Sequence, residues 1–435
     1  IRIREKPNIL ALKAIIIYLK QEVMIMSNEN LENKRWLIAI AGVIMQVSLG
    51  TVYAWSVFKK PIMTNHGWTE TSTQVTFMIC IGMIGLAAAF GGTLLDKKGP
   101  RFVATIGGIL FGIGTLLAGL ADQMGSIALL YLGFGFIGGL GNGFGYVTPI
   151  ATLIRWFPDK RGLVTGLAVM GFGFGAFFMG KIAPGMINTM GVANTFYILG
   201  AIFLVLVTAS AQLFKNPPQG WLPAGFTPVA GKSATAADSF NFDEAIKTPQ
   251  WWMLWGMLFL NVTAGIGLLS QLSPMAQELY KNTITDEKAL AIAGGSIVAI
   301  ASIFNGLGRL FWAGLSDSIG RKNVFMIMFL TQAVLYIILP QVSNVMLFTV
   351  FACYLLACYG GGFATMPGFA ADAFGPAYIG KVYGIMITAW GVAGVVGPFV
   401  FAQFKGVALY VAAGLLIVGF LDALLYKKPD AKSAK

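Results

Sequence analysis

The chain has 435 residues, of which 57% are hydrophobic and 11% are charged. Soluble domains carry about 25% charged residues, so a chain with this composition and a mean hydropathy of +0.75 has too few charges to cover a water-exposed surface. The composition therefore excludes an ordinary soluble enzyme and indicates a chain that faces lipid along most of its length. The net charge of +12 comes from short clusters of Lys and Arg between apolar stretches, so we expect no nucleic-acid partner.

Residues 1–35 precede the first long apolar segment and are expected to lie in the cytoplasm. Residues 1–25 carry five cations around a short apolar stretch that Lys13 interrupts, and no small-residue cleavage site follows. Met24 and Met26 offer natural starts just before a polar stretch. We therefore interpret residues 1–25 as an upstream extension rather than a signal peptide.

The rest of the chain is dominated by apolar segments long enough to cross a hydrocarbon core of about 30 Å as helices. We predict twelve spans, at 36–58, 75–95, 103–121, 127–149, 163–183, 195–213, 251–272, 289–312, 324–340, 345–367, 383–403 and 406–426. A proline-containing polar segment, 214–250, follows the sixth span. The pattern predicts an all-α membrane protein with six-helix bundles at 36–213 and 251–426, a central loop at 214–250 and a tail at 427–435.

The distribution of Lys and Arg between the loops predicts the orientation in the membrane. From Ser27 onward, the tails and the loops on the side of Arg35 hold eighteen cations. The loops on the opposite side hold five, which are Lys59, Lys60, Lys281, Lys288 and Lys405. We therefore expect both termini and the central loop in the cytoplasm. Lys181 falls at the outer end of its span, where its ammonium can reach the interface.

A short motif occurs twice, once in each half of the chain, at an offset of 221 residues. Each copy joins an acidic residue near a helix end to a turn glycine and a basic pair, in Gly92-Thr-Leu-Leu-Asp96-Lys-Lys-Gly99-Pro-Arg101 and Gly314-Leu-Ser-Asp317-Ser-Ile-Gly320-Arg321-Lys322. Such a loop can hold neighbouring helices together by charge while the glycine makes the reversal. We expect Asp96, Arg101, Asp317 and Arg321 to form a conformational latch.

With twelve spans in two halves and this repeated loop, the chain resembles the major facilitator superfamily. The resemblance implies two six-helix bundles that rock about a site near the middle of the membrane. It covers essentially all of residues 35–427.

Five further strings, in the same order along the chain, resemble the oxalate/formate antiporter family, which is related to the monocarboxylate transporters. They are Gly50-Thr-Val-Tyr53-Ala-Trp55-Ser, Arg155-Trp-Phe-Pro-Asp-Lys-Arg-Gly162, Pro217-Pro-Gln-Gly-Trp-Leu-Pro223, Thr248-Pro-Gln-Trp-Trp252 and Phe304-Asn-Gly-Leu-Gly-Arg309-Leu-Phe-Trp312. The resemblance implies a secondary active transporter of small carboxylates, surrounded by lipid in a bacterial inner membrane. We expect it to work as a monomer.

Arg309 is the residue most informative about the cargo. It lies eight residues before Asp317, and so about 12 Å into the membrane. An unpaired charge at that depth costs roughly 2.5 to 3.5 kcal/mol, and no Asp or Glu occupies the central part of any predicted span. The guanidinium is therefore either capped by backbone carbonyls and water or neutralised by an anionic substrate.

A substrate carboxylate is the partner that we favour, because a planar guanidinium binds it in a bidentate geometry that lysine cannot reproduce. The resemblance implies the same role, since the matching arginine of these families binds the substrate carboxylate.

Two positions depart from the relatives. The oxalate transporter of the family has a second cation in span 11, where this chain reads Ile387-Thr-Ala389-Trp390-Gly391. One fixed cation neutralises a monoanion but leaves a dianion with net charge in a medium of low dielectric, so we expect formate, lactate or pyruvate rather than oxalate. Monocarboxylate transporters have an aspartate where this chain has Asn305, which cannot titrate. Anion antiport and proton-coupled symport by another route both stay open.

Further substrate contacts are expected from aromatic rings and amides in the spans. A tyrosine offers a ring to the apolar part of a small acid and a hydroxyl to its second oxygen. The resemblance implies cavity aromatics at Tyr53, Tyr146, Phe172, Tyr359 and Phe363, to which we add Trp390, Asn142 and Asn305 as substrate-binding residues.

Three other function classes are less consistent with the sequence. A carrier for another solute, such as a sugar or a drug, is the main alternative. A non-transporting anion receptor would need an output domain, for which the cytoplasmic segments are too short. An enzyme would need a nucleophile–base pair or a metal cluster, but Cys80, Cys353 and Cys358 have no metal-ligand spacing to the single histidine, His66. We therefore expect no enzymatic activity, no metal and no cofactor.

Glycine runs in spans 4, 5, 10 and 11 resemble nucleotide-binding loops only superficially. None follows a strand or includes the lysine of a P-loop. Small residues within membrane spans let helices approach closely, so these runs are expected at helix contacts that change as the halves rock.

Overall fold

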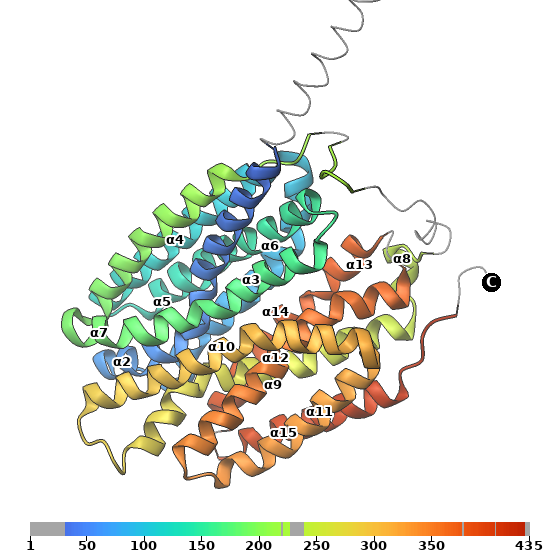
Figure 1. Cartoon of the computed structure of the whole chain (residues 1–435). Helices are drawn as coiled ribbons and strands as arrows, with labels where there is room; N and C mark the ends of the chain where they lie inside the picture. Colours follow the sequence, from blue (N-terminus) through green and yellow to red (C-terminus); the bar gives the residue numbers. More distant parts are fainter. Residues whose placement is uncertain (1–30, 219–220, 227–238, 376–377, 405, 431–435) are drawn as a thin grey trace, which may run out of the picture.

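The computed structural model describes residues 31–218, 221–226, 239–375, 378–404 and 406–430 (Figure 1). Within these ranges the chain is helical and contains no strand. Two halves are defined here by sequence, the first at 31–226 and the second at 239–430. Figure 1 shows the blue-to-green helices of the first half gathered beside the yellow-to-red helices of the second half.

The first half begins with a helix at 31–50, which continues through a 3₁₀ turn into a further helix. Its remaining elements are η1 (Thr51–Ala54), α2 (Trp55–His66), α3 (Glu70–Lys98), α4 (Pro100–Met124), α5 (Ile127–Leu130), the π-helix η2 (Tyr131–Gly138), α6 (Gly139–Trp156) and α7 (Arg161–Leu213).

The second half begins with a single helical turn and then repeats a series of long helices. Its elements are α8 (Phe242–Ala245), α9 (Pro249–Tyr280), α10 (Glu287–Ile319), α11 (Arg321–Ile338), η4 (Leu339–Gln341), α12 (Val345–Phe374), α13 (Ile379–Met386), α14 (Thr388–Gln403) and α15 (Ala408–Leu425).

Eleven helical segments of the described ranges are long and apolar enough to cross a membrane. The longest, Gly166–Leu213, has 48 residues, more than twice the length that one crossing needs. Its helix breaks at Gly191, where φ is +83°, a backbone conformation that glycine adopts without a steric penalty. The predicted fifth and sixth spans end and begin on either side of this break.

Local signals in the sequence set several helix ends. The side chains of Thr69, Asp286 and Asn344 accept hydrogen bonds from the first turns of α3, α10 and α12, which satisfies amide groups that a helix start otherwise leaves unpaired. Gly99 and Gly320, the turn glycines of the repeated motif, have φ values of +81° and +91°. The motif therefore makes the same tight reversal in both halves.

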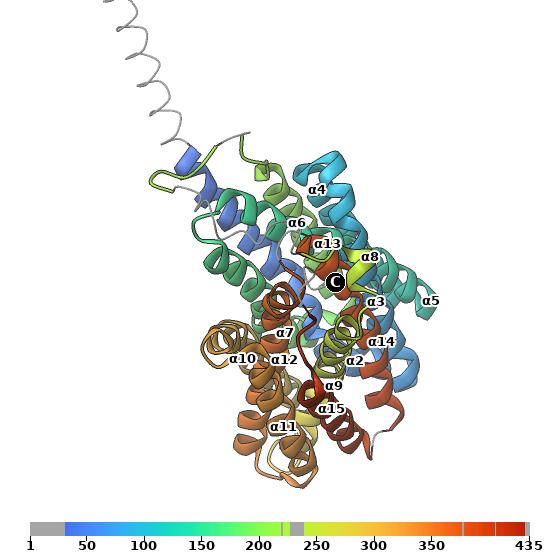
Figure 2. The same cartoon turned by 90° about the vertical axis from the view of Figure 1, so that its right-hand side faces the viewer.

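The most extensive contacts between the two halves are made by two pairs of helices. α7 packs against α10, and α3 packs against α14. Figure 2 shows the first pair on one flank of the molecule and the second pair on the other. At both contacts backbone meets backbone: an added Cβ at Gly85 would lie 2.6 Å from the Cα of Gly391, and one at Gly180 would lie 2.4 Å from the oxygen of Gly295. Of the glycine runs expected at helix contacts, those in spans 5 and 11 therefore contribute to the interface between the halves, whereas those in spans 4 and 10 contact helices of their own half.

One detail of the predicted spans is wrong. Lys59 and Lys60 were expected in a loop after residue 58, but α2 continues to His66 and includes both lysines. The side chain of Lys59 is buried, with a relative exposure of 1%. A count of charges along the chain assigns cations near a span end to the loop, because it does not register partners that come from other helices.

Candidate functional site

Arg309 lies on α10 with a relative exposure of 3%. Its Nε donates a hydrogen bond to Oδ1 of Asn305, one turn earlier, at 3.3 Å. Its guanidinium carbon lies 5.5 Å from the ring centroid of Phe363 on α12, a cation–π contact. Nη1 is buried without a hydrogen-bond partner. Within the described part of the chain, no carboxylate forms an ion pair with this guanidinium.

The position of Arg309 depends on an unusually close approach of α10 and α12. An added Cβ at Gly360 would lie 2.2 Å from the backbone oxygen of Asn305 and 3.1 Å from Cγ of Arg309. From the other side, an added Cβ at Gly308 would lie 2.3 Å from the oxygen of Ala357. Because only glycine fits at both places, the two helices touch along their backbones where the arginine begins.

Tyr53 brings the first half of the chain to this site. It lies in η1, the 3₁₀ turn between the first helix and α2, and is buried. Its ring contacts Phe172 of α7 edge to face, with centroids 5.0 Å apart. Its hydroxyl forms a hydrogen bond of 2.6 Å with the hydroxyl of Tyr359 on α12. This hydrogen bond joins the two halves, and its second partner lies on α12, the helix that packs against α10.

Tyr146 and Trp390 extend the aromatic contacts on the other side. Tyr146 of α6 packs against Phe172 at 5.1 Å and against Trp390 of α14 at 5.4 Å between centroids. Trp390 in turn packs against Phe363 at 5.3 Å. The indole nitrogen of Trp390, like Nη1 of Arg309, is buried without a hydrogen bond. The six aromatic side chains expected at the site thus form one contact cluster with rings from both halves.

The chemistry of this cluster suits a small anion with an apolar part. The guanidinium and the indole N–H offer unused donors, the three tyrosines offer hydroxyls, and the rings offer apolar faces. All six aromatic residues have relative exposures of 6% or less, so the site is closed to solvent. Low dielectric strengthens the attraction between the arginine and an anion there.

Asn142 does not join this cluster by any described contact. Its Nδ2 donates to the backbone oxygen of Leu49 at 2.9 Å, so it ties α6 to the first helix. Sequence reasoning missed two other buried amides that hold the site's backbone. Gln46 donates to the oxygen of Tyr146 at 3.2 Å, and Asn261 approaches the oxygen of Tyr359 at 3.4 Å. The sequence signal that could have identified these two residues is a glutamine or asparagine inside an otherwise apolar span.

Side-chain contacts of the expected latch residues are described in the second half but not for Asp96 in the first half. In the second half, Arg321 forms an ion pair with Asp317 and approaches Asp372 of α12 at 3.3 Å. Asp372 was not among the expected residues. In the first half, Arg101 is exposed in the first turn of α4, and the side chain of Asp96 lies outside the described side chains.

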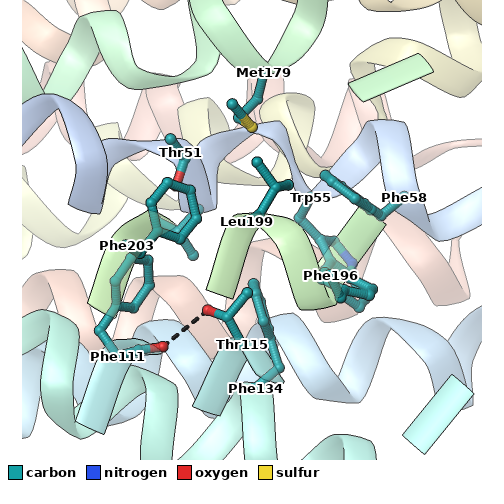
Figure 3. Close-up of a pocket in the computed structure, with 11 residues that line it drawn as sticks. Thr51, Trp55, Phe58, Phe111, Thr115, Phe134, Met179, Phe196, Leu199 and Phe203 are labelled. Atoms are coloured by element: carbon teal, nitrogen blue, oxygen red, sulfur yellow. Dashed lines mark hydrogen bonds between the residues drawn. The ribbon is translucent and has the colours of Figure 1, made fainter. Parts of the chain in front are cut away.

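A narrow cavity lies away from Arg309, within the first half (Figure 3). It is enclosed by η1, α2, α4, η2 and α7, and its lining is mostly aromatic and aliphatic. Thr115 faces it but donates to the backbone oxygen of Phe111 at 2.8 Å, the dashed line in Figure 3. With no charged group in its lining, this cavity is not suited to a carboxylate.

A model of the major facilitator superfamily matches residues 38–398 and, in a second match, residues 289–435. The chain belongs to the major facilitator superfamily. The oxalate:formate antiporter of Oxalobacter formigenes is 29% identical to it over 373 residues, which cover 84% of each chain. Apicoplast pyruvate carrier 1 of Toxoplasma gondii is 28% identical over 69% of this chain and 64% of the carrier.

Monocarboxylate transporter 14 of Mus musculus is 22% identical over 90% of this chain and 89% of the transporter. The resemblance to the oxalate/formate antiporters and monocarboxylate transporters, indicated by the sequence motifs, is therefore confirmed. The chain is a multi-pass membrane protein of a superfamily whose named relatives are transporters rather than enzymes.

Proposed function

We propose that this protein is a secondary active transporter that moves a small monocarboxylate across the membrane by alternating access. Arg309 carries the proposal: it is a buried cation without a carboxylate partner among the described residues, in a cluster built from both halves. A charge buried in this way needs a counter-ion. A substrate carboxylate supplies this counter-ion, and its binding favours the closed arrangement of the two halves around the substrate.

The number of fixed charges favours a monoanion over oxalate. Trp390 stands in the cluster where the oxalate transporter has a cation, and its ring fills the space with apolar surface. A monocarboxylate with Arg309 is neutral, whereas oxalate would leave one negative charge in a closed, dry site. Formate, lactate and pyruvate are the substrates that fit this count.

We favour anion exchange over proton symport. Asn305 holds Arg309 by a hydrogen bond and cannot carry a proton. No Asp or Glu among the described residues forms an ion pair with Arg309, and the hydroxyls of Tyr53 and Tyr359 bond to each other. An empty site would leave the arginine charge uncompensated during the return step, so a second anion on the way back lowers that barrier.

The proposal also fixes the membrane arrangement. With α7 counted as two spans on either side of Gly191, the chain has twelve spans in two bundles, 36–213 and 251–426, joined by a cytoplasmic loop at 214–250. Both termini face the cytoplasm of a bacterial cell, as the excess of Lys and Arg on that side favours. The Arg321 and Asp317 pair, with its counterpart at Asp96 and Arg101, latches helix ends on the cytoplasmic side.

Uptake by purified protein in liposomes tests the function. Labelled formate, lactate, pyruvate and oxalate are offered with and without a counter-anion inside, and with and without a pH gradient. We expect uptake of a monocarboxylate that internal anion accelerates and a pH gradient does not. Uptake of a sugar or a cationic drug, with none of the carboxylates carried, would overturn the proposal.

A further inference from the structure

Lys59 and Lys60 form a second cationic site at some distance from Arg309. Lys59 is buried, and its Nζ donates to Oε1 of Glu70 on α3 at 2.9 Å. It also donates to Oε1 of Gln271 on α9. The ammonium of the next residue, Lys60, donates to Oε1 of Gln277, also on α9, at 3.0 Å. Two neighbouring lysines of the first half are thus each met by an amide oxygen of the second half.

This site lies in line with the aromatic cluster, toward the end of the molecule opposite the two ends of the described chain. Lys59 follows Tyr53 by six residues, and Gln271 follows Gly265 by six residues. Gly265 packs directly on Tyr359, since an added Cβ there would lie 2.5 Å from Cβ of the tyrosine. At about 1.5 Å per residue, both groups lie about 9 Å beyond the contact between Tyr53 and Tyr359.

A separate observation indicates that an acceptor belongs in this site. Gln271 has a relative exposure of 6%, and its Nε2 is buried without a hydrogen-bond partner. A buried donor without an acceptor is unfavourable, so Nε2 of Gln271 is available to a group that accepts hydrogen bonds.

The charge of the site matches the proposed cargo. Two lysines and Glu70 leave one net positive charge, which one monocarboxylate neutralises. In alternating access the halves separate at this end, and the amides of α9 then move away from the lysines of α2. When the pathway opens, Lys60 therefore loses the amide oxygen of Gln277, and Lys59 loses that of Gln271 but keeps Glu70 of its own half.

We propose that Lys59, Lys60 and Gln271 form an outer binding station, where a carboxylate replaces the α9 amide oxygens before it moves on to Arg309. This inference rests on the proposed function and extends it to a second place on the same path. The station also explains why a buried lysine lies at the boundary between the halves, where an apolar residue would pack at lower cost.

The test compares substrate affinity from the two sides of the membrane. Lys59→Gln is combined with Glu70→Gln, so that no unpaired carboxylate is left behind. We expect the half-saturation concentration for external monocarboxylate to rise about tenfold in intact cells. The half-saturation concentration on the cytoplasmic side, measured in inside-out vesicles, should stay unchanged. The double variant keeps the net charge of the site and removes only the Lys59 donor, whereas Lys60→Gln removes the net positive charge, so we expect Lys60→Gln to raise the external half-saturation concentration at least as much.

Lys181→Gln is the matched control, since it removes an exposed lysine whose ammonium donates a hydrogen bond to Ser296 and forms no ion pair among the described residues. It should leave both constants unchanged. Equal changes on both sides in the Lys59 variant would indicate a general packing defect, and opposite changes would indicate a gate without a binding role; either result, or no change, overturns the station. Should the double variant not reach the membrane, Lys60→Gln and Gln271→Leu decide by the same criterion.

The outcomes also separate this inference from the proposed function. Wild-type protein that carries no carboxylate at all contradicts the function itself. Carboxylate transport that needs Arg309 but shows no one-sided effect of Lys59 contradicts only the outer station.

Discussion

The hydroxyl of Tyr53 lies 2.6 Å from the hydroxyl of Tyr359, although 306 residues separate them in the chain. One tyrosine comes from a 3₁₀ turn of the first half and the other from α12 of the second half. The hydrogen bond belongs to the cluster around Arg309. It lies on the side of this cluster that leads to the lysines of α2. Two hydroxyls that satisfy each other can turn to a carboxylate when one arrives, without leaving a polar group unpaired.

Removal of either hydroxyl should therefore weaken substrate binding by a modest amount. Tyr53→Phe and Tyr359→Phe should each raise the half-saturation concentration about fivefold, equivalent to roughly 1 kcal/mol for one hydrogen bond. The double variant should lose less than the product of the single losses, because both changes remove the same bond. Fully multiplicative effects would mean that the two hydroxyls act independently.

Arg309 should be indispensable for transport. Arg309→Ala should lower the initial rate of monocarboxylate exchange at least a hundredfold, because the cargo then enters a dry site without a counter-charge. Arg309→Lys keeps the charge but loses the planar fork, so we expect a loss of about tenfold or more. Initial uptake rates in liposomes, normalised to reconstituted protein, measure both. Full activity in either variant would contradict the assigned role.

A second cation in the cluster should change the charge preference. Trp390→Lys should raise the uptake of oxalate relative to lactate, since two fixed cations match a dianion. Trp390→Phe is the matched control: it also disturbs the contacts with Tyr146 and Phe363 but adds no charge. The ratio of oxalate to lactate uptake is the readout. An equal ratio in both variants would show that charge at this position does not select the substrate.

The contact between α10 and α12 should tolerate no side chain at Gly360. A Cβ there would meet the backbone of Asn305 at 2.2 Å, so Gly360→Ala should push the two helices apart and displace Arg309. We expect a lower melting temperature, by several degrees, and an increased half-saturation concentration. Gly414→Ala in α15, where nothing lies within 4 Å of an added Cβ, should do neither. Scanning fluorimetry of the detergent-purified protein measures the stability.

The latch should affect turnover rather than binding. Arg321→Gln removes the ion pair with Asp317 and the contact with Asp372. Surface ion pairs contribute only about 1 kcal/mol or less, so we expect the maximal exchange rate to change by a few fold while the half-saturation concentration stays constant. A change in affinity without a change in rate would place Arg321 in the binding pathway instead.

The long apolar helices and the burial of Arg309 could be predicted because both depend on position along a single helix; the depth of Arg309 in the membrane stays a prediction. A long apolar segment predicts one membrane crossing, and the helical rise over the eight residues from Asp317 predicts that Arg309 lies near the middle of that crossing. The convergence of the aromatic residues came from resemblance, because no periodicity relates Tyr53 of one half to Tyr359 of the other. Their contacts are described by the structure, and their role in binding stays a prediction.

The burial of Lys59 could not be predicted in the same way. Its partners, Glu70 and Gln271, come from α3 and α9, and only the packed arrangement of helices brings them to one place. Asn142 illustrates the opposite error, since an amide inside a span can be used entirely by a neighbouring backbone, here that of Leu49.

The glycine crossings of Gly85 with Gly391 and of Gly180 with Gly295 lie on the two flanks of the interface between the halves. Surfaces that touch through bare backbone have no interdigitated side chains that must unlock before one can turn on the other. The two lines of contact can therefore act as pivots with a low barrier to rotation. The free-energy difference between the two orientations of the halves is then determined by the groups that lie between these contacts, above all by whether Arg309 has bound a substrate.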